Sequence, residues 1–171
     1  MEIKPNNSEK VFADNILLVT KTDLKGNIIY ANRNFLNIVG MSEKRLIGAP
    51  HNIIRHPDMP KIIFKYLWNS LEKPEEIHAY VKNICNDGSF YWVLANVTPS
   101  FDNSNQGKKD KVIGYHSSRR APSKAALEII IPLYEKLLEA EKSGGIDASE
   151  KIMSTLLKEK GVLYDEFILS I

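Results

Sequence analysis

Between residues 49 and 60 the chain concentrates side chains that can bind a ligand. The segment Ala49–Pro60, here called the proline loop, holds three prolines together with Arg55, Asp58, His51 and His56. Prolines restrict the backbone, so the side chains between them are presented at a lower entropic cost than on a flexible loop. A guanidinium, imidazoles and a carboxylate are groups that bind phosphates, carbonyl edges and ring nitrogens. We therefore interpret the proline loop as part of a binding site.

Arg55 and Asp58 each allow two interpretations. An arginine can bind a pyrophosphate or a ring carbonyl through a fork of hydrogen bonds, and a lysine cannot match that geometry. The alternative for Arg55 is a surface ion pair with Asp58 or Glu43. We expect Asp58 to cap the helix that follows the loop, because its carboxylate would repel a phosphate. Arg55 and His56 are therefore the candidates in this loop for direct contact with a ligand.

Asn83 is the second candidate, and it lies on a predicted strand. The period of two along this strand places Asn83 on one face with Ile77, Ala79, Val81 and Cys85. An unpaired buried amide costs about 1–3 kcal/mol. Its partner is therefore either a ligand that offers neighbouring donor and acceptor atoms or the protein backbone.

Apolar periodicity and turn signals predict the elements that position these side chains. The predicted strands are residues 16–20, 28–31, 76–85, 90–100 and 111–118, and the predicted helices begin at Asn32, Ser42 and Asp58. A polar, lysine-rich loop is expected at residues 102–111. Strands on both sides of a run of helices indicate an α+β fold with one five-stranded antiparallel sheet. The short helices would cover one face of this sheet, with a pocket between the two.

Composition divides the chain into three parts. Residues 1–11 form a polar lead, residues 12–121 contain the predicted sheet and its helices, and residues 122–171 become helical. In the last part, apolar residues at helical spacing form stripes that are too wide to leave in water. We therefore expect this C-terminal extension, residues 122–171, to pack on the sheet, on itself or on a partner.

Net charge, cysteine content and the length of apolar runs exclude several classes of protein. With 23 basic and 21 acidic residues the net charge is only +2, which does not indicate nucleic-acid binding. The single cysteine, Cys85, excludes an internal disulfide and a multi-cysteine metal site. The N-terminus lacks the apolar core of a signal peptide and no apolar run approaches a membrane span, so we expect a cytoplasmic protein without direct membrane insertion. No glycine-rich phosphate loop, paired-carboxylate site or Ser/His/Asp pattern indicates an enzyme.

Several motifs together resemble the PAS domain of aerotaxis receptors. The run from Arg55 to Pro60 is the most specific of them, and it is followed by Phe64 and Trp68. Further matches are Val81-Lys82-Asn83, Gly88, Phe90-Tyr91-Trp92-Val93 and Ile113-Gly114-Tyr115. The resemblance covers residues 12–121 and implies a PAS fold.

In that family the pocket between sheet and helices binds FAD non-covalently, and the redox state of the flavin sets the signal. The matching positions imply these cofactor-binding residues: Asn32, Arg55, His56, Asp58, Phe64, Trp68 and Asn83. Ile77 departs from the pattern, because the family has a tryptophan inside the pocket at this position. The resemblance also implies a separate membrane chemotaxis transducer of the HAMP and methyl-accepting type as partner, and a homodimer is compatible with the sequence.

Two alternatives to a flavin-binding redox sensor remain open at this point. The first is a haem-binding gas sensor, since PAS pockets also hold haem, with an axial ligand among the histidines His51, His56, His78 and His116. The second is an interaction module without a cofactor, in which the helical extension and the sheet serve only assembly. An absorption spectrum distinguishes the three.

Overall fold

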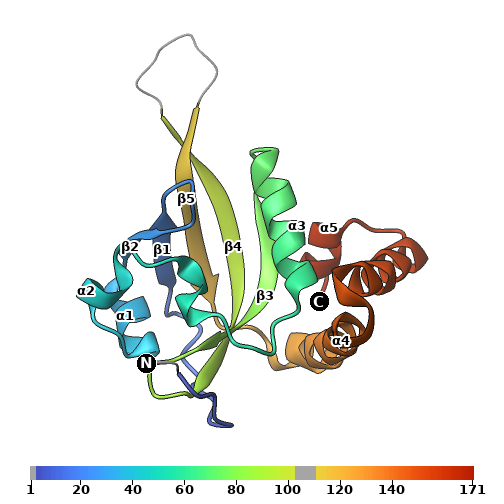
Figure 1. The fold of residues 1–171 in the computed structure, drawn as a ribbon, viewed down its shortest axis with the longest axis horizontal. Helices are drawn as coiled ribbons and strands as arrows, with labels where there is room; N and C mark the ends of the chain where they lie inside the picture. The colour runs from blue at the N-terminus through green and yellow to red at the C-terminus, as the bar shows by residue number, and fades with distance from the viewer. Residues whose placement is uncertain (1–2, 103–110) are drawn as a thin grey trace.

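The computed structural model describes residues 3–102 and 111–171, so the predicted lysine-rich loop lies mostly outside the described residues. Figure 1 shows a central sheet with helices on both sides. The strands are β1 (Leu18–Thr22), β2 (Ile28–Ala31), β3 (Ile77–Ile84), β4 (Phe90–Asp102) and β5 (Lys111–Arg120). The helices are α1 (Arg33–Val39), α2 (Glu43–Leu46), the 3-10 helix η1 (His51–Ile54), α3 (Lys61–Glu72), α4 (Lys124–Lys160) and α5 (Tyr164–Leu169).

The five strands form one sheet in the order β2-β1-β5-β4-β3, and each neighbouring pair is antiparallel. This confirms the predicted α+β architecture. The central strands β4 and β5 come from the last third of the sheet's sequence, whereas β1 and β2 come from its start. The sheet therefore brings β1 beside β5, so that residues about a hundred positions apart share one surface.

Side chains alternate between the two faces of the sheet. On β3 and β4, Asn83 and Ala95 point to the face that we call the inner face, which α1, α2 and η1 cover on the left of Figure 1. Tyr80 and Leu94 point to the opposite, outer face, where the C-terminal extension packs. The predicted short helices are therefore gathered over one face, as expected.

Local signals explain how α1 begins and ends. Asn32 is the N-cap, and its side-chain oxygen accepts a hydrogen bond from the backbone N–H of Phe35 at 3.0 Å. Gly40 ends the helix in the left-handed conformation, with φ of 65°. Phe35 and Val39 are fully buried against the inner face. The predicted N-cap role of Asn32 is confirmed.

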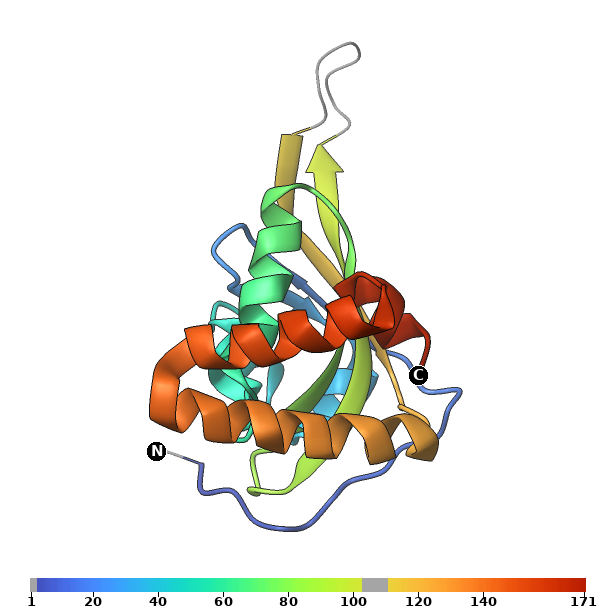
Figure 2. The same ribbon diagram turned by 90° about the vertical axis from the view of Figure 1, so that its right-hand side faces the viewer.

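The C-terminal extension packs on the sheet of its own chain, which resolves one of the questions that the sequence left open. α4 is broken at Gly145 (φ 68°, ψ −166°) into two arms, residues 124–144 and 146–160. Figure 2 shows the two arms side by side across the molecule, with α3 and the sheet behind them. Neither α4 nor another helix among the described residues is long and apolar enough to cross a membrane.

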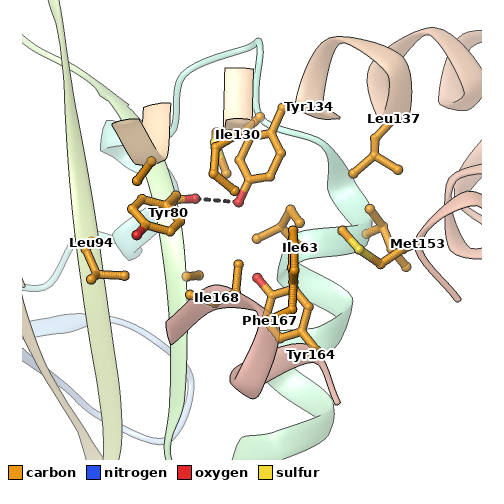
Figure 3. Close-up of a cluster of buried hydrophobic side chains, with 14 of the residues drawn as sticks. Ile63, Tyr80, Leu94, Ile130, Tyr134, Leu137, Met153, Tyr164, Phe167 and Ile168 are labelled. Atoms are coloured by element: carbon orange, nitrogen blue, oxygen red, sulfur yellow. Dashed lines mark hydrogen bonds between the residues drawn. The ribbon is translucent and has the colours of Figure 1, made fainter. Parts of the chain in front are cut away.

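A buried cluster joins the extension to the outer face (Figure 3). Ile130 and Leu137 of α4 are completely buried, and the Tyr134 hydroxyl donates a hydrogen bond of 2.7 Å to the backbone carbonyl of Tyr80. Each large apolar side chain buried in this way contributes about 1.5–3 kcal/mol. The extension is therefore part of the folded domain rather than a free tail.

The α5 helix covers the open edge of the sheet. β3 is an edge strand, and the backbone N–H of His78 donates to the Asp165 carboxylate at 2.6 Å. At the end of the chain, the Tyr80 hydroxyl donates to the backbone carbonyl of Ile171 at 3.1 Å. Edge strands with free backbone groups pair readily with other chains. The extension thus blocks strand pairing along part of β3.

The polar lead is also bound to the sheet over its described part. Asn6 and Lys10 donate backbone hydrogen bonds to Gly88 and Phe90, at 2.8 and 2.7 Å. Gly88 has φ of 83°, and a Cβ atom there would lie 2.3 Å from the Lys4 carbonyl oxygen. The turn between β3 and β4 therefore needs a glycine for the lead to approach it.

Candidate ligand-binding cavity

A cavity of about 230 Å³ lies between the inner face of the sheet, the proline loop and α3. The sheet contributes polar and small apolar side chains: Thr20, Thr22, Val81, Asn83, Ala95, Val97, Tyr115, Ser117 and Arg119. The proline loop contributes Pro50, His51, Asn52 and Arg55, and α3 contributes Phe64, Leu67, Trp68 and Leu71. The cavity therefore has a polar floor and an apolar wall, which is the usual composition of a small-molecule site.

Two polar atoms on the cavity floor lack partners. The amide nitrogen of Asn83 and the hydroxyl of Ser117 are buried and have no hydrogen-bond partner within the described residues. Asn83 is only 3% exposed. Buried polar groups in folded proteins are nearly always hydrogen-bonded. These two groups are therefore available to a ligand in the cavity.

Arg119 is a buried cation at the cavity. Its guanidinium donates to the Thr20 hydroxyl at 3.0 Å and to Nε2 of His51 at 2.8 Å. Because Nε2 accepts, His51 is neutral and carries its ring proton on Nδ1. Burial lowers the pKa of Arg119 to about 10, and burial together with the Arg119 charge lowers the pKa of His51 to about 3.

Among the described residues, the Arg119 charge has no acidic counterpart. Arg119 stays protonated at neutral pH and forms no ion pair with a carboxylate in the part of the chain that the structure describes. Taking an unpaired charge out of water costs several kcal/mol, on the order estimated for buried ions. An anionic or electron-rich group of a ligand would compensate this charge.

Aromatic side chains form the outer rim of the cavity. The Arg55 guanidinium lies over the Phe64 ring, 3.5 Å from its centroid, so Arg55 is held by a cation–π contact. Trp68 meets Tyr115 edge-on, with 5.8 Å between ring centroids, and both residues line the cavity. The indole of Trp68 also lies close to Gly26 in the turn between β1 and β2. α3 is therefore in contact with the opposite edge of the sheet through Trp68.

Four of the predicted site residues line the cavity, and three do not. The lining residues are Arg55, Phe64, Trp68 and Asn83. Asn32 is occupied as the cap of α1, and His56 packs edge-on against Phe90 with 5.9 Å between ring centroids. Asp58 lies outside the cavity, with its carboxylate 2.7 Å from Nζ of Lys82. Ile77, the position that departs from the family pattern, is buried in a core cluster with Ile62 and Ile63 of α3 and does not line the cavity.

The predicted capping role of Asp58 is wrong. α3 begins at Lys61 with Pro60 as its N-cap residue, and the Asp58 carboxylate binds Lys82 on β3 instead. The alternative ion pair of Arg55 with Asp58 is also not formed, because Arg55 lies on Phe64. The carboxylate that binds the start of α3 comes from Glu141 in α4. Residues adjacent in sequence suggested the cap, whereas a residue 80 positions away supplies it.

Of the four histidines, His51 alone lines the cavity. Its Nε2 is engaged by Arg119. His56 has Nδ1 bound to the backbone N–H of Asp58 at 3.1 Å, and burial lowers its pKa. His78 binds Asp165 of α5. Within residues 3–102 and 111–171, no group of three or more His, Cys, Asp or Glu side chains is placed to hold a metal ion.

Sequence reasoning missed the polar floor on β1 and β5. Thr20 and Ser117 are direct partners in the pairing of these strands, and Arg119 is two residues further along β5. A polar residue at every second position of the last strand was the available signal, since Tyr115, Ser117 and Arg119 share one face. Only the pairing of β1 with β5 shows that this face is buried.

A five-stranded antiparallel sheet with short helices over one face and a cavity beneath them defines a PAS-type sensor fold. A family model described as the PAS fold matches residues 28–116. The chain therefore belongs to the PAS-fold family.

Curated relatives are signalling proteins. The chain is 36% identical over 151 residues to the Aerotaxis receptor of Escherichia coli, a match that covers 88% of this chain and 28% of the receptor. It is 31% identical over 98 residues to the biofilm dispersion protein BdlA of Pseudomonas aeruginosa, which covers 56% of this chain and 22% of that protein. The chain thus spans less than a third of the length of each of these two relatives.

Solved structures show the same fold at low identity. The PAS domain of a Colwellia psychrerythraea protein superposes with a TM-score of 0.54 at 22% identity, covering 65% of this chain and 91% of that domain. The light-state structure of the blue-light photoreceptor Aureochrome1 LOV superposes with a TM-score of 0.57 at 21% identity, covering 70% and 91% of the two chains. These similarities establish the fold.

Proposed function

We propose that this protein is a cytoplasmic, non-enzymatic redox sensor that binds FAD non-covalently in the cavity. The observation that carries the proposal is the buried amide nitrogen of Asn83, which lines the cavity without a hydrogen-bond partner among the described residues. The match to the Aerotaxis receptor of Escherichia coli, over most of this chain, supports a sensor of the same kind.

The residues around the cavity fit a flavin. A flavin ring edge presents neighbouring donors and acceptors, which suit the Asn83 amide and the Ser117 hydroxyl. Its electron-rich carbonyl groups suit the unpaired charge of Arg119, and its planar ring suits the aromatic wall of Phe64 and Trp68. A volume of about 230 Å³ is below the usual range of about 300–1,000 Å³ for ligand pockets, so part of the dinucleotide would lie outside the cavity, towards Arg55.

A bound flavin would supply a redox couple whose two states differ in charge and in hydrogen bonding at the ring edge. The amide of Asn83 can answer such a change, because it carries both a donor and an acceptor and can turn either towards the ligand. Arg119 would favour the state with more negative charge. Trp68, which lines the cavity and packs edge-on against Tyr115, would shield the ring from water.

The direct test is the absorption spectrum of the purified protein, before and after incubation with FAD. We expect flavin bands that bleach with dithionite, and quenching of FAD fluorescence on binding. Absence of both after reconstitution would contradict the proposal. A Soret band would instead support the haem alternative, and a colourless protein whose melting temperature ignores added FAD would support the interaction module.

We further propose that a membrane chemotaxis transducer of the HAMP and methyl-accepting type receives the signal. The similarity to a receptor supports this partner. The expected result is redox-dependent co-purification of the protein with such a transducer. Binding that is equal for the oxidised and reduced protein would contradict a signalling role for the contact.

A further inference from the structure

The first turn of α3 is capped by a side chain from the C-terminal extension. The N-cap residue Pro60 makes no side-chain hydrogen bond to the helix. The two carboxylate oxygens of Glu141 accept from the backbone N–H groups of Lys61 and Ile62, each at 2.9 Å. The first N–H groups of a helix have no partner within the helix, and a carboxylate there is also favoured by the helix dipole. Glu141 thus satisfies two groups that α3 cannot satisfy itself.

Both arms of α4 determine where Glu141 lies. Glu141 belongs to the first arm. The hydroxyl of the completely buried Ser149, in the second arm, lies 3.0 Å from Oε1 of Glu141 and 2.9 Å from the backbone carbonyl oxygen of Ile146, and it can donate to either. A second contact between the extension and α3 joins Lys65 to Glu150 at 2.7 Å. The carboxylate of Glu141 is therefore in place only when the two arms are folded against each other and docked beside α3.

The same helix forms the apolar wall of the cavity. Phe64 and Trp68 line the cavity, whereas Ile62 and Ile63 lie in the buried cluster with the extension. The proline loop, with Arg55 at the cavity, ends directly at the capped turn. A shift of the first turn of α3 would therefore change both the cavity wall and the docking surface of α4.

We propose that Glu141 is a positioning residue that couples occupancy of the cavity to docking of the C-terminal extension. The ligand is FAD, so this inference rests on the proposed function. Coupling between two sites is reciprocal. A ligand that stabilises the capped position of α3 strengthens docking of the extension, and loss of docking lowers the affinity for the ligand by the same factor. Couplings of this kind typically change affinity by about 5-fold to 150-fold.

The test compares Glu141→Ala with Glu139→Ala in the full chain. Glu139 is a matched control, because it lies on the same arm, its side chain is 76% exposed, and its carboxylate binds only Lys142 among the described residues. FAD affinity is measured by fluorescence quenching, and hydrogen exchange of residues 124–171 is measured with and without FAD. We expect FAD to slow exchange in the extension of the wild type and of Glu139→Ala. In Glu141→Ala we expect about 5-fold or more weaker FAD binding and no FAD-dependent slowing.

Two further variants separate coupling from a general loss of structure. Glu141→Gln keeps an acceptor oxygen, and it should restore part of the affinity and part of the FAD-dependent slowing. Ser149→Ala removes the hydroxyl that can donate to Glu141, and it should give a smaller effect in the same direction even if Glu141→Ala does not fold. The coupling would be overturned if Glu141→Ala bound FAD with wild-type affinity and showed the wild-type slowing of exchange. If only Ser149→Ala folds, the same result in that variant would overturn it. Either result would leave the proposed FAD binding itself standing. A wild-type protein that binds no FAD would overturn the proposed function and, with it, the coupling.

Discussion

The two faces of the sheet are built from the same strands but satisfy their side chains differently. On the outer face of β3 and β4, the extension buries apolar groups, and the Tyr134 hydroxyl donates a hydrogen bond to the Tyr80 carbonyl. On the inner face, Asn83, Ser117 and Arg119 are buried beside a cavity. Among the described residues, the Asn83 amide nitrogen and the Ser117 hydroxyl have no hydrogen-bond partner, and Arg119 forms no ion pair. The outer face is packed against the chain's own extension, whereas the inner face borders a cavity in which polar groups lie without partners among the described residues.

The outer face therefore contributes mainly to the stability of the fold, and the inner face is the candidate for ligand binding. Apolar burial without unpaired polar groups favours folding, whereas buried groups without partners cost free energy. The buried polar groups of the inner face cost free energy in the ligand-free protein, and a ligand that hydrogen-bonds to them would recover this free energy on binding. Each face should therefore respond differently when its side chains are changed.

The largest effect is expected from a cavity in the outer core. Ile130→Ala should lower the free energy of unfolding by about 2–5 kcal/mol, because Ile130 is completely buried in the cluster between α4 and the sheet. Its neighbour Ile129 is 48% exposed, so Ile129→Ala should change stability by no more than about 0.5 kcal/mol. Urea unfolding of the two variants measures the difference. Equal costs would mean that the extension is not docked on the outer face.

A pH effect is expected from the inner face. The pKa of His51 is lowered to about 3 in the folded protein, so between pH 6.5 and 3 the unfolded chain binds a proton that the folded chain does not. Stability due to His51 is therefore full above pH 6.5 and falls as the pH is lowered, by about 2 kcal/mol between pH 7 and pH 5. His51→Gln keeps an acceptor for Arg119 but does not titrate, and it should lose less stability over this range. If urea unfolding at the two pH values shows the same loss of stability in both proteins, the lowered pKa of His51 is disproved.

The smallest effect is expected from a matched pair of asparagines on β3 and β4. Asn96 is bonded to Glu76 and His78, so Asn96→Leu should lower the free energy of unfolding by about 1 kcal/mol and leave FAD binding unchanged. The amide nitrogen of Asn83 has no partner among the described residues, so Asn83→Leu should leave the stability of the flavin-free protein equal or higher and weaken FAD binding about 10-fold. Thermal melts and fluorescence titration measure both. A loss of stability in Asn83→Leu equal to that in Asn96→Leu would remove the distinction between the two faces.

Much of the fold could be predicted from local patterns. The cap at Asn32 and the alternation that places Asn83 on a face with apolar residues are both found in the structure. The cavity floor was predicted less well, because Thr20 and Arg119 lie on strands that pair only in the folded sheet. The role of Asp58 was wrong for a related reason, since capping depends on which carboxylate is near the helix in space.

The sequence by itself determined the order of elements, the α+β architecture and the position of the proline loop, because turns, caps and strand periodicity depend on neighbouring residues. The tertiary structure alone decided that the C-terminal extension covers the outer face, that Arg119 lies at the cavity, and that Glu141 caps α3. These features depend on contacts between segments far apart in the chain. Such contacts form only when apolar surfaces from different elements are buried together, and no local pattern records which polar groups that burial leaves without partners.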